Sequence, residues 1–266
     1  MEEIVVTKEG GVVSVTLNRP KRKNAITMAM FDELRRVIAD VEHDPDARVL
    51  MLRGAGGVFC SGADLTPGEH SEDNQPRGSL SAHSHQLIRD RVGGAALALH
   101  QLPKPTIAAV EGLASGAGAN LAFGCDLVYA SEDARFSEIF VRRGLSIDCG
   151  GTWLLPRLVG LQKAKELTYF GDWIGAEDAL RLGLVTQMFA ASEFEQELVA
   201  RANRLAEQAP IALALNKQAL NSSHHLSFAQ ALDQEAASQA LCTGTDDFAE
   251  GMRAFVEKRR PQFKGG

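Results

Sequence analysis

The first 54 residues combine short apolar runs of strand type with one helical pattern. Apolar and polar residues alternate over residues 4–7 and 12–17, on either side of a glycine pair, which predicts a β-hairpin. Residues 49–52 (VLML) are continuously apolar and are followed closely by Gly54. Such a run is typical of a strand that is buried on both faces of a parallel sheet.

An amphipathic helix is predicted between these strands. Thr27 has the side chain of an N-cap residue, and Pro45 follows the end of the helical pattern. Four apolar residues fall on one helical face: Phe31, Leu34, Ile38 and Val41. We therefore expect a helix that begins after Thr27 and ends before Pro45.

The middle of the chain continues the alternation of helix and strand. We expect a helix over residues 80–102, a strand over 106–110, a helix near 119–124 and a strand over 127–130. This succession predicts right-handed crossovers and an α/β fold. The polar residues 66–81, with two prolines and two glycines, are expected to form a loop near the site.

The pattern changes at residue 191, after which it is almost entirely helical. Capping-box signatures begin at Ser192 and at Ser227. We therefore predict a core over residues 1–190 and a helical C-terminal region over residues 191–266.

Composition is that of an ordinary globular protein and narrows the range of partners. Of 266 residues, 45% are hydrophobic and 23% are charged, and the net charge is −6. An acidic chain with 6% aromatic residues lacks the basic surface and the stacking side chains of a nucleic-acid binder. The longest mostly apolar stretch, residues 106–130, contains Glu111 and Asp126, so we expect no membrane span.

The four cysteines are far apart in sequence and form no CxxC pair. This spacing disfavours a disulfide scaffold or a zinc finger and fits a reducing compartment. The acidic start lacks the segments of a secretory signal, and we expect a cytoplasmic protein. The seven histidines have no metal-ligand spacing, so we expect no metal site.

Candidate chemistry gathers at three glycine-bearing turns, residues 60–64, 112–118 and 148–152. Each follows an apolar segment, and ligands of α/β sheets bind where strands end and helices begin. A dinucleotide fingerprint at Gly116 and Gly118 is incomplete because its third glycine is missing. Neither a P-loop nor a G-x-S-x-G elbow occurs in the sequence.

Motifs in a fixed order run along nearly the whole chain. They are LNRP at 17–20, FCSGADL at 59–65, EGLASGAG at 111–118, GGT at 150–152 and FVEKR at 255–259. Together they resemble the crotonase superfamily of enoyl-CoA hydratases and isomerases. The resemblance implies a crotonase-like (ββα)n spiral core with a C-terminal helical extension, assembled as a homotrimer or homohexamer. It also implies an acyl-CoA substrate and no separate cofactor, since coenzyme A is part of that substrate.

In that family two backbone amides bind the thioester oxygen, and by position they are those of Ala63 and Ala117. Removal of a C2 proton from a thioester leaves an enolate, which such donors stabilise as its charge develops. One donor is typically worth roughly 2.7–4 kcal/mol. The residue pattern alone allows a second reading, in which Gly62 and Gly116 merely permit tight turns.

The family hydratases hold one water with two glutamates, and these positions are occupied here by Asn120 and Phe140. Neither side chain can act as a base, so the resemblance disfavours efficient water addition. Glu138 lies two residues before Phe140, and we expect it to face another way in either a strand or a helix.

One carboxylate does stand at a family catalytic position, that of Asp148. The segment DCGGTWLLPR at 148–157 resembles the isomerases of ring-epoxidised phenylacetyl-CoA, a subgroup similar in chemistry to Δ3,Δ2-enoyl-CoA isomerases. By residue type and spacing alone, Asp148 is better explained as a helix N-cap. A helix N-terminus would lower its pKa, whereas burial beside Ile147 and Trp153 would raise it.

The resemblance also implies contacts along the bound acyl-CoA. The positions concerned are Arg22, Ala25, Ser61, Gly62, Asp64, Leu65, Gly116, Asn120, Phe140, Phe255 and Lys258. Arg22 and Lys258 would face the phosphates, and Phe255 would support the adenine from a neighbouring subunit.

We therefore predict an acyl-CoA isomerase in which Asp148 removes a proton and returns it elsewhere. Its action would move a double bond or rearrange a ring epoxide, in a pocket walled by Leu65, Phe140, Ile147 and the 66–81 loop. Three alternatives remain open: an enoyl-CoA hydratase, a non-catalytic acyl-CoA-binding protein, and a hydrolase with Asp148 as nucleophile.

Overall fold

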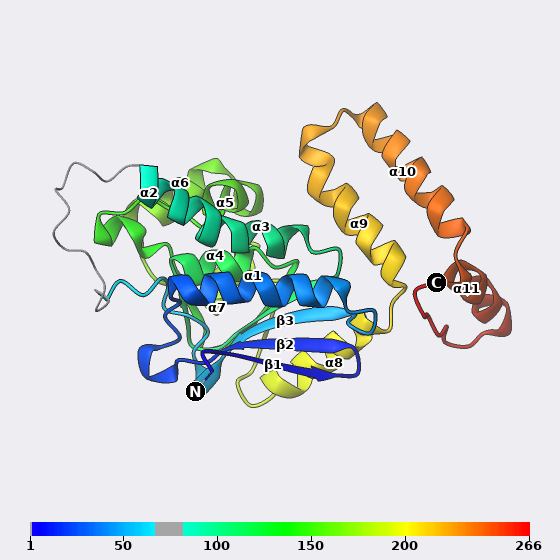
Figure 1. The fold of residues 1–266 in the computed structure, drawn as a ribbon, viewed down its shortest axis with the longest axis horizontal. Coiled ribbons are helices and arrows are strands. Elements are labelled where there is room, and N and C mark those ends of the chain that lie inside the picture. Colours follow the sequence, from blue (N-terminus) through cyan, green and yellow to red (C-terminus); the bar gives the residue numbers. More distant parts are fainter. Residues whose placement is uncertain (1, 67–81) are drawn as a thin grey trace.

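The computed structural model describes residues 2–66 and 82–266 (Figure 1). Its strands are β1 (Ile4–Glu9), β2 (Val12–Leu17), β3 (Val49–Gly54), β4 (Thr106–Val110), β5 (Leu113–Ser115), β6 (Leu127–Ser131), β7 (Arg135–Ser137), β8 (Ile174–Gly175) and β9 (Gln187–Phe189). Its α-helices are α1 (Met28–His43), α2 (Ala82–Leu87), α3 (Gly94–Gln101), α4 (Ala117–Phe123), α5 (Gly151–Val159), α6 (Leu161–Phe170), α7 (Ala176–Arg181), α8 (Phe194–Ala206), α9 (Pro210–Ser222), α10 (Phe228–Thr243) and α11 (Asp246–Glu257). Shorter helical turns are η1 (Pro20–Arg22), η2 (Ala55–Gly57), η3 (Ile88–Gly93), η4 (Ile139–Arg143) and η5 (Ser223–His225).

The main sheet has the strand order β1-β2-β3-β4-β6-β9. β1 and β2 form the predicted antiparallel hairpin, and the other neighbours pair in parallel. In β3, Leu50 and Leu52 join the larger apolar core, while Val49 and Met51 join a second core on the opposite face. The continuous apolar run is thus explained by burial on both faces, and the α/β fold is confirmed.

Helices cover both faces of this sheet (Figure 1). α1 contributes Phe31, Leu34 and Ile38 to the larger core. On the opposite face, α8 contributes Phe194 and Leu198 to the second core. The sheet is therefore the middle layer of three.

The predicted helix boundaries are mostly close to the observed ones. Thr27 caps α1, because its Oγ1 accepts a hydrogen bond from the Met30 amide at 3.2 Å. The helix expected over residues 80–102 is divided into α2, a π-helical turn η3, and α3. Of the loop expected over residues 66–81, positions 67–81 lie outside the described residues.

The C-terminal region contains one correct and one wrong cap prediction. Ser227 forms the predicted capping box with Gln230 at the start of α10. The box at Ser192 is wrong: α8 begins at Phe194, behind the N-cap residue Glu193, with no side-chain capping bond. Ser192 therefore lies in the preceding turn, one residue too early to cap α8.

The last three helices lie apart from the sheet. α9, α10 and α11 extend to one side of the molecule, whereas α8 stays against the main sheet (Figure 1). Large apolar side chains on these three helices are exposed, namely Leu220, Phe228, Leu232, Leu241, Phe248, Met252, Phe255 and Val256. In residues 2–66 and 82–266, no helix combines the length and the apolar character that crossing a membrane requires.

Candidate active site

Two of the three glycine-bearing turns meet at the end of β5. Cys60 forms a parallel bridge with Ala114, and Ser115 Oγ donates a hydrogen bond to the Ser61 carbonyl at 2.8 Å. Gly62 has a φ of +102°, and a Cβ added there would lie 2.9 Å from the Ser115 carbonyl oxygen and 3.9 Å from the Ala117 nitrogen. The close approach of these two turns therefore requires glycine at 62.

The amides of Ala63 and Ala117 are available at this junction. Ala117 is the first residue of α4, where a helix leaves its N–H groups without partners. Neither amide donates a hydrogen bond to another of the described residues. Two free N–H groups on adjoining turns form a suitable place for a developing negative charge.

Asp148 is not a helix cap. α5 begins at Gly151 behind the N-cap residue Gly150, and no side chain caps it. Asp148 Oδ1 is buried and has no hydrogen-bond partner among the described residues. Burial raises the pKa of Asp148 to about 6, so desolvation outweighs any lowering by the helix terminus.

Asn120 connects the parts of the site. Its Nδ2 donates to the Asp148 carbonyl at 3.0 Å and to Glu138 Oε2 at 3.3 Å. A Cβ on Gly151 would lie 2.5 Å from Asn120 Nδ2, so the start of α5 can approach α4 only with glycine at that position. Asn120 therefore fixes the segment that carries Asp148.

The expectation that Glu138 faces away from the site is wrong. Both Glu138 and Phe140 are buried, and the Glu138 carboxylate reaches Asn120. The alternation argument fails because β7 ends at Ser137 and the chain turns into the 3₁₀ helix η4, with Glu138 at φ −84° and ψ 62°. The sequence signal that could have found it is the single acid between the two aromatic residues Phe136 and Phe140.

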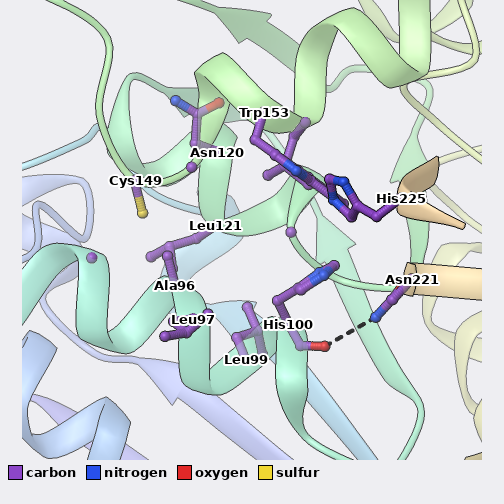
Figure 2. A pocket seen from close by; sticks show the side chains of 14 residues that line it. Ala96, Leu97, Leu99, His100, Asn120, Leu121, Cys149, Trp153, Asn221 and His225 are labelled. Carbon is purple, nitrogen blue, oxygen red and sulfur yellow. Dashed lines mark hydrogen bonds between the residues drawn. The ribbon is translucent and has the colours of Figure 1, made fainter. Parts of the chain in front are cut away.

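An apolar cavity of about 400 Å³ adjoins this network (Figure 2). Its lining comes from α3, α4, the start of α5 and the α9–η5 segment: Gly93, Ala96, Leu97, Leu99, His100, Asn120, Leu121, Gly124, Cys149, Gly150, Trp153, Leu154, Asn221 and His225. His100 and Trp153 pack edge to face with ring centroids 5.0 Å apart. None of Leu65, Phe140 and Ile147, the expected pocket walls, lines this cavity. The sequence did not predict these lining residues, because they come from elements that are far apart in the chain.

The expected coenzyme A positions divide into two groups. Residues 61–65 run beside the segment that holds Arg22 and Ala25, since the Ser61 amide donates to the Lys23 carbonyl and the Asp64 amide to the Ile26 carbonyl. Phe255 and Lys258 lie at the end of α11, which Figure 1 places far from α4. A single chain therefore does not bring these two residues to the site.

Comparison with known proteins agrees with this geometry. Residues 7–266 match the family model described as enoyl-CoA hydratase/isomerase. The chain belongs to this family. It is 39% identical to 1,2-epoxyphenylacetyl-CoA isomerase of Escherichia coli K12, over 100% of this chain and 99% of that protein. It is 36% identical to a short-chain-enoyl-CoA hydratase of Clostridium acetobutylicum, over 98% and 97% of the two chains.

Solved structures of the family confirm the crotonase-like fold. The enoyl-CoA hydratase of Bacillus anthracis has a TM-score of 0.91 at 31% identity, with 100% of both chains covered. A family enzyme is thus indicated, but the named relatives include both isomerases and hydratases. The reaction must be argued from the site itself.

Proposed function

We propose that this protein is an acyl-CoA isomerase that moves a double bond, or rearranges a ring epoxide, through a thioester enolate. The observation that carries the proposal is Asp148, a half-buried residue whose carboxylate oxygen Oδ1 is buried, has no hydrogen-bond partner among the described residues and caps no helix. One such base suffices, because isomerisation removes a proton from one carbon and returns it to another.

The two free amides complete the chemistry. When Asp148 removes a C2 proton, the electron pair of the C–H bond passes into the thioester and negative charge grows on its oxygen. The Ala63 and Ala117 amides would bind that oxygen, and the charge would then be stabilised without rearrangement of the protein. Nothing in this cycle is consumed, so the enzyme would need no cofactor beyond the coenzyme A of its substrate.

The surroundings of Asp148 favour isomerisation over water addition. Asn120 and Phe140 occupy the positions at which family hydratases carry glutamates, and Phe140 is buried. The adjoining cavity is lined mainly by apolar side chains. A dry pocket of this kind disfavours attack by water on the intermediate. The similarity to an epoxyphenylacetyl-CoA isomerase supports the same choice.

The test is turnover of a 3-enoyl-CoA by the wild-type protein and by Asp148→Asn. The wild type should form the conjugated 2-enoyl-CoA, and Asp148→Asn should lose at least about 100-fold in kcat, a typical contribution of a general base. Asp133→Asn, an exposed aspartate outside the site, serves as the matched control and should keep full activity. Unchanged turnover by Asp148→Asn would reject the proposed role.

A hydratase is the second candidate, and one observation favours it. Glu138 brings a second carboxyl group to Asn120, and two carboxyl groups can hold one water. Relatives named as hydratases are 36% identical over nearly the whole chain. Incubation with crotonyl-CoA distinguishes the two candidates: loss of the conjugated double bond as fast as isomerisation would favour the hydratase.

We also propose that the enzyme acts as a homotrimer or homohexamer in the cytoplasm. The exposed apolar residues of α9–α11 support an assembly of several chains. Phe255 and Lys258 would then contact coenzyme A bound to a neighbouring subunit.

A further inference from the structure

Glu138 lies in the site but has no part in a one-base isomerisation. It is 4% exposed, and its Oε2 accepts a hydrogen bond from Asn120 Nδ2 at 3.3 Å. Its Oε1 is buried and has no hydrogen-bond partner among the described residues. A buried carboxylate with an unpaired oxygen strongly favours its neutral, protonated form.

The charges that face Glu138 do not favour its ionisation. From the segment before α5 it faces Asp148, a group of like charge, and the buried thiol of Cys149. From α4 it meets the neutral amide of Asn120. The charged side chains of η4 and of the turn after α6 are exposed: Arg142, Arg143 and Asp172. Arg142 is directed to Asp172 and to the Phe170 carbonyl, and so is engaged away from Glu138.

We propose that Glu138 is a positioning residue that stays protonated, so that Asp148 alone carries negative charge while the enolate forms. This proposal rests on the proposed role of Asp148 as the base. Two carboxyl groups in one buried site ionise one after the other, because the first charge opposes the second. The site then contains one ionised and one neutral carboxyl group, and Asn120 donates hydrogen bonds to the Glu138 carboxyl group and to the backbone carbonyl of Asp148.

The order of the two pKa values agrees with a neutral Glu138 beside an ionised Asp148. Burial raises the pKa of Asp148 to about 6, and burial together with the Asp148 charge raises that of Glu138 to about 8. Between these values Asp148 is a base and Glu138 is neutral. Above about 8 a second negative charge appears beside the forming enolate and opposes it.

A neutral Glu138 also supplies a donor. Asn120 Oδ1 and Asp148 Oδ1 are both buried acceptors without partners among the described residues. A protonated carboxyl group has one O–H donor, which an ionised one lacks. Protonation of Glu138 therefore removes a charge and adds one O–H donor to a site that contains unpartnered acceptors.

The first test is exchange of the C2 hydrogens of butyryl-CoA in heavy water, followed across pH. In the wild type, exchange should fall about tenfold for each pH unit above about 8, as expected when one group must keep its proton. Glu138→Gln is neutral at every pH and should lose this alkaline fall. Glu166→Gln, an exposed glutamate on α6, is the matched control and should keep it. An alkaline fall that persists in Glu138→Gln, or is absent from the wild type, would overturn the proposal.

The second test needs neither turnover nor a Glu138 variant. It is an infrared titration of ligand-free Asp148→Asn. At neutral pH the spectrum should contain the carbonyl stretch of a buried protonated carboxyl group. Absence of that band at neutral pH would contradict the proposal. If Asp148→Asn exchanges C2 hydrogens as fast as the wild type, the proposed isomerase mechanism fails, while the infrared result still reports on Glu138.

Discussion

At the scale of single residues, the site is marked by polar atoms that are buried without partners. Oxygens of Asn120, Glu138 and Asp148 lack hydrogen bonds to the described residues. Each unpaired buried group costs about 1–3 kcal/mol, and such groups are rare in native proteins. Asn120 connects these three residues and lines the apolar cavity, and such a cluster of unpaired polar atoms marks a candidate substrate site.

The raised pKa of Asp148 predicts an acid limit to activity. The base must be ionised, so the rate should be lost as pH falls through about 6 and Asp148 takes up its proton. A kcat profile for 3-enoyl-CoA isomerisation measures this limit. A rate that stays constant down to pH 4, near the ordinary aspartate value, would show that Asp148 is not the titrating base.

The N–H of Ala117 can be removed by substitution with proline, which has no amide hydrogen. Proline is tolerated at the first position of a helix, so Ala117→Pro deletes the N–H of α4 with little effect on the fold. We expect kcat to fall by about 100- to 1,000-fold, the usual cost of one oxyanion donor. Ala117→Gly keeps the amide and should stay close to the wild type. Equal rates for both variants would remove Ala117 from the mechanism.

The buried Glu138 predicts an unusual dependence of stability on pH. The folded protein binds this proton more tightly than the unfolded chain, so stability should decline as pH rises from 4.5 to about 8. Glu138→Gln removes that decline and should have a higher Tm than the wild type above pH 8. Thermal unfolding across pH checks this, at about 2–4 °C for each kcal/mol in a chain of this size. A lower Tm for Glu138→Gln at pH 9 would contradict it.

The sequence predicted these residues unevenly. The resemblance to the crotonase superfamily predicts the roles of Asp148, Ala63 and Ala117, and these roles stay predictions. Glu138 was missed, since its direction depends on the turn from β7 into η4, which period-two alternation does not describe. Whether Asp148 caps a helix could be decided only from the start of α5, whose N-cap residue Gly150 lies two residues beyond the expected cap position.

At the scale of elements, α4 and α5 pack closely because Gly151 has no side chain. A Cβ at 151 would lie 2.5 Å from both Asn120 Nδ2 and Ile147 Cδ1, and 2.6 Å from Asn120 Oδ1. Gly151→Ala should therefore displace Asn120, lower stability by about 1–3 kcal/mol and reduce kcat together. Gly175→Ala, where nothing lies within 4 Å, is the matched control and should be neutral. Thermal unfolding and turnover measure both effects, and a fully active Gly151→Ala would contradict the tight packing of these helices.

The helices and strands with a regular pattern of apolar residues were predicted best. The hairpin, α1 and the buried strands β3 and β4 agree with the pattern within a few residues. The long helix before β4 was not predicted to contain the π-helical turn η3, because the prediction assumed one regular α-helical period throughout. The apolar cavity could not be predicted, since α3, α4, α5 and η5 converge only in the folded chain.

At the scale of the whole molecule, the exposed apolar faces of α9–α11 predict assembly. Sedimentation should give three or six times the chain mass of 28.6 kDa. Phe228 is 80% exposed in the single chain, and Phe228→Asp should shift the protein toward smaller species by placing a charge at an apolar contact. A wild type that sediments as a monomer would contradict the proposed assembly and the contribution of α11 to a neighbouring site.

A crystal structure with a bound, unreactive acyl-CoA analogue tests the central claim most directly. We predict the thioester oxygen about 2.7–3.1 Å from the Ala63 and Ala117 nitrogens. We predict a carboxylate oxygen of Asp148 roughly 3–3.5 Å from C2 of the acyl group, in position to remove its proton. A complex in which Asp148 faces bulk solvent, away from the acyl carbons, would contradict the proposed mechanism.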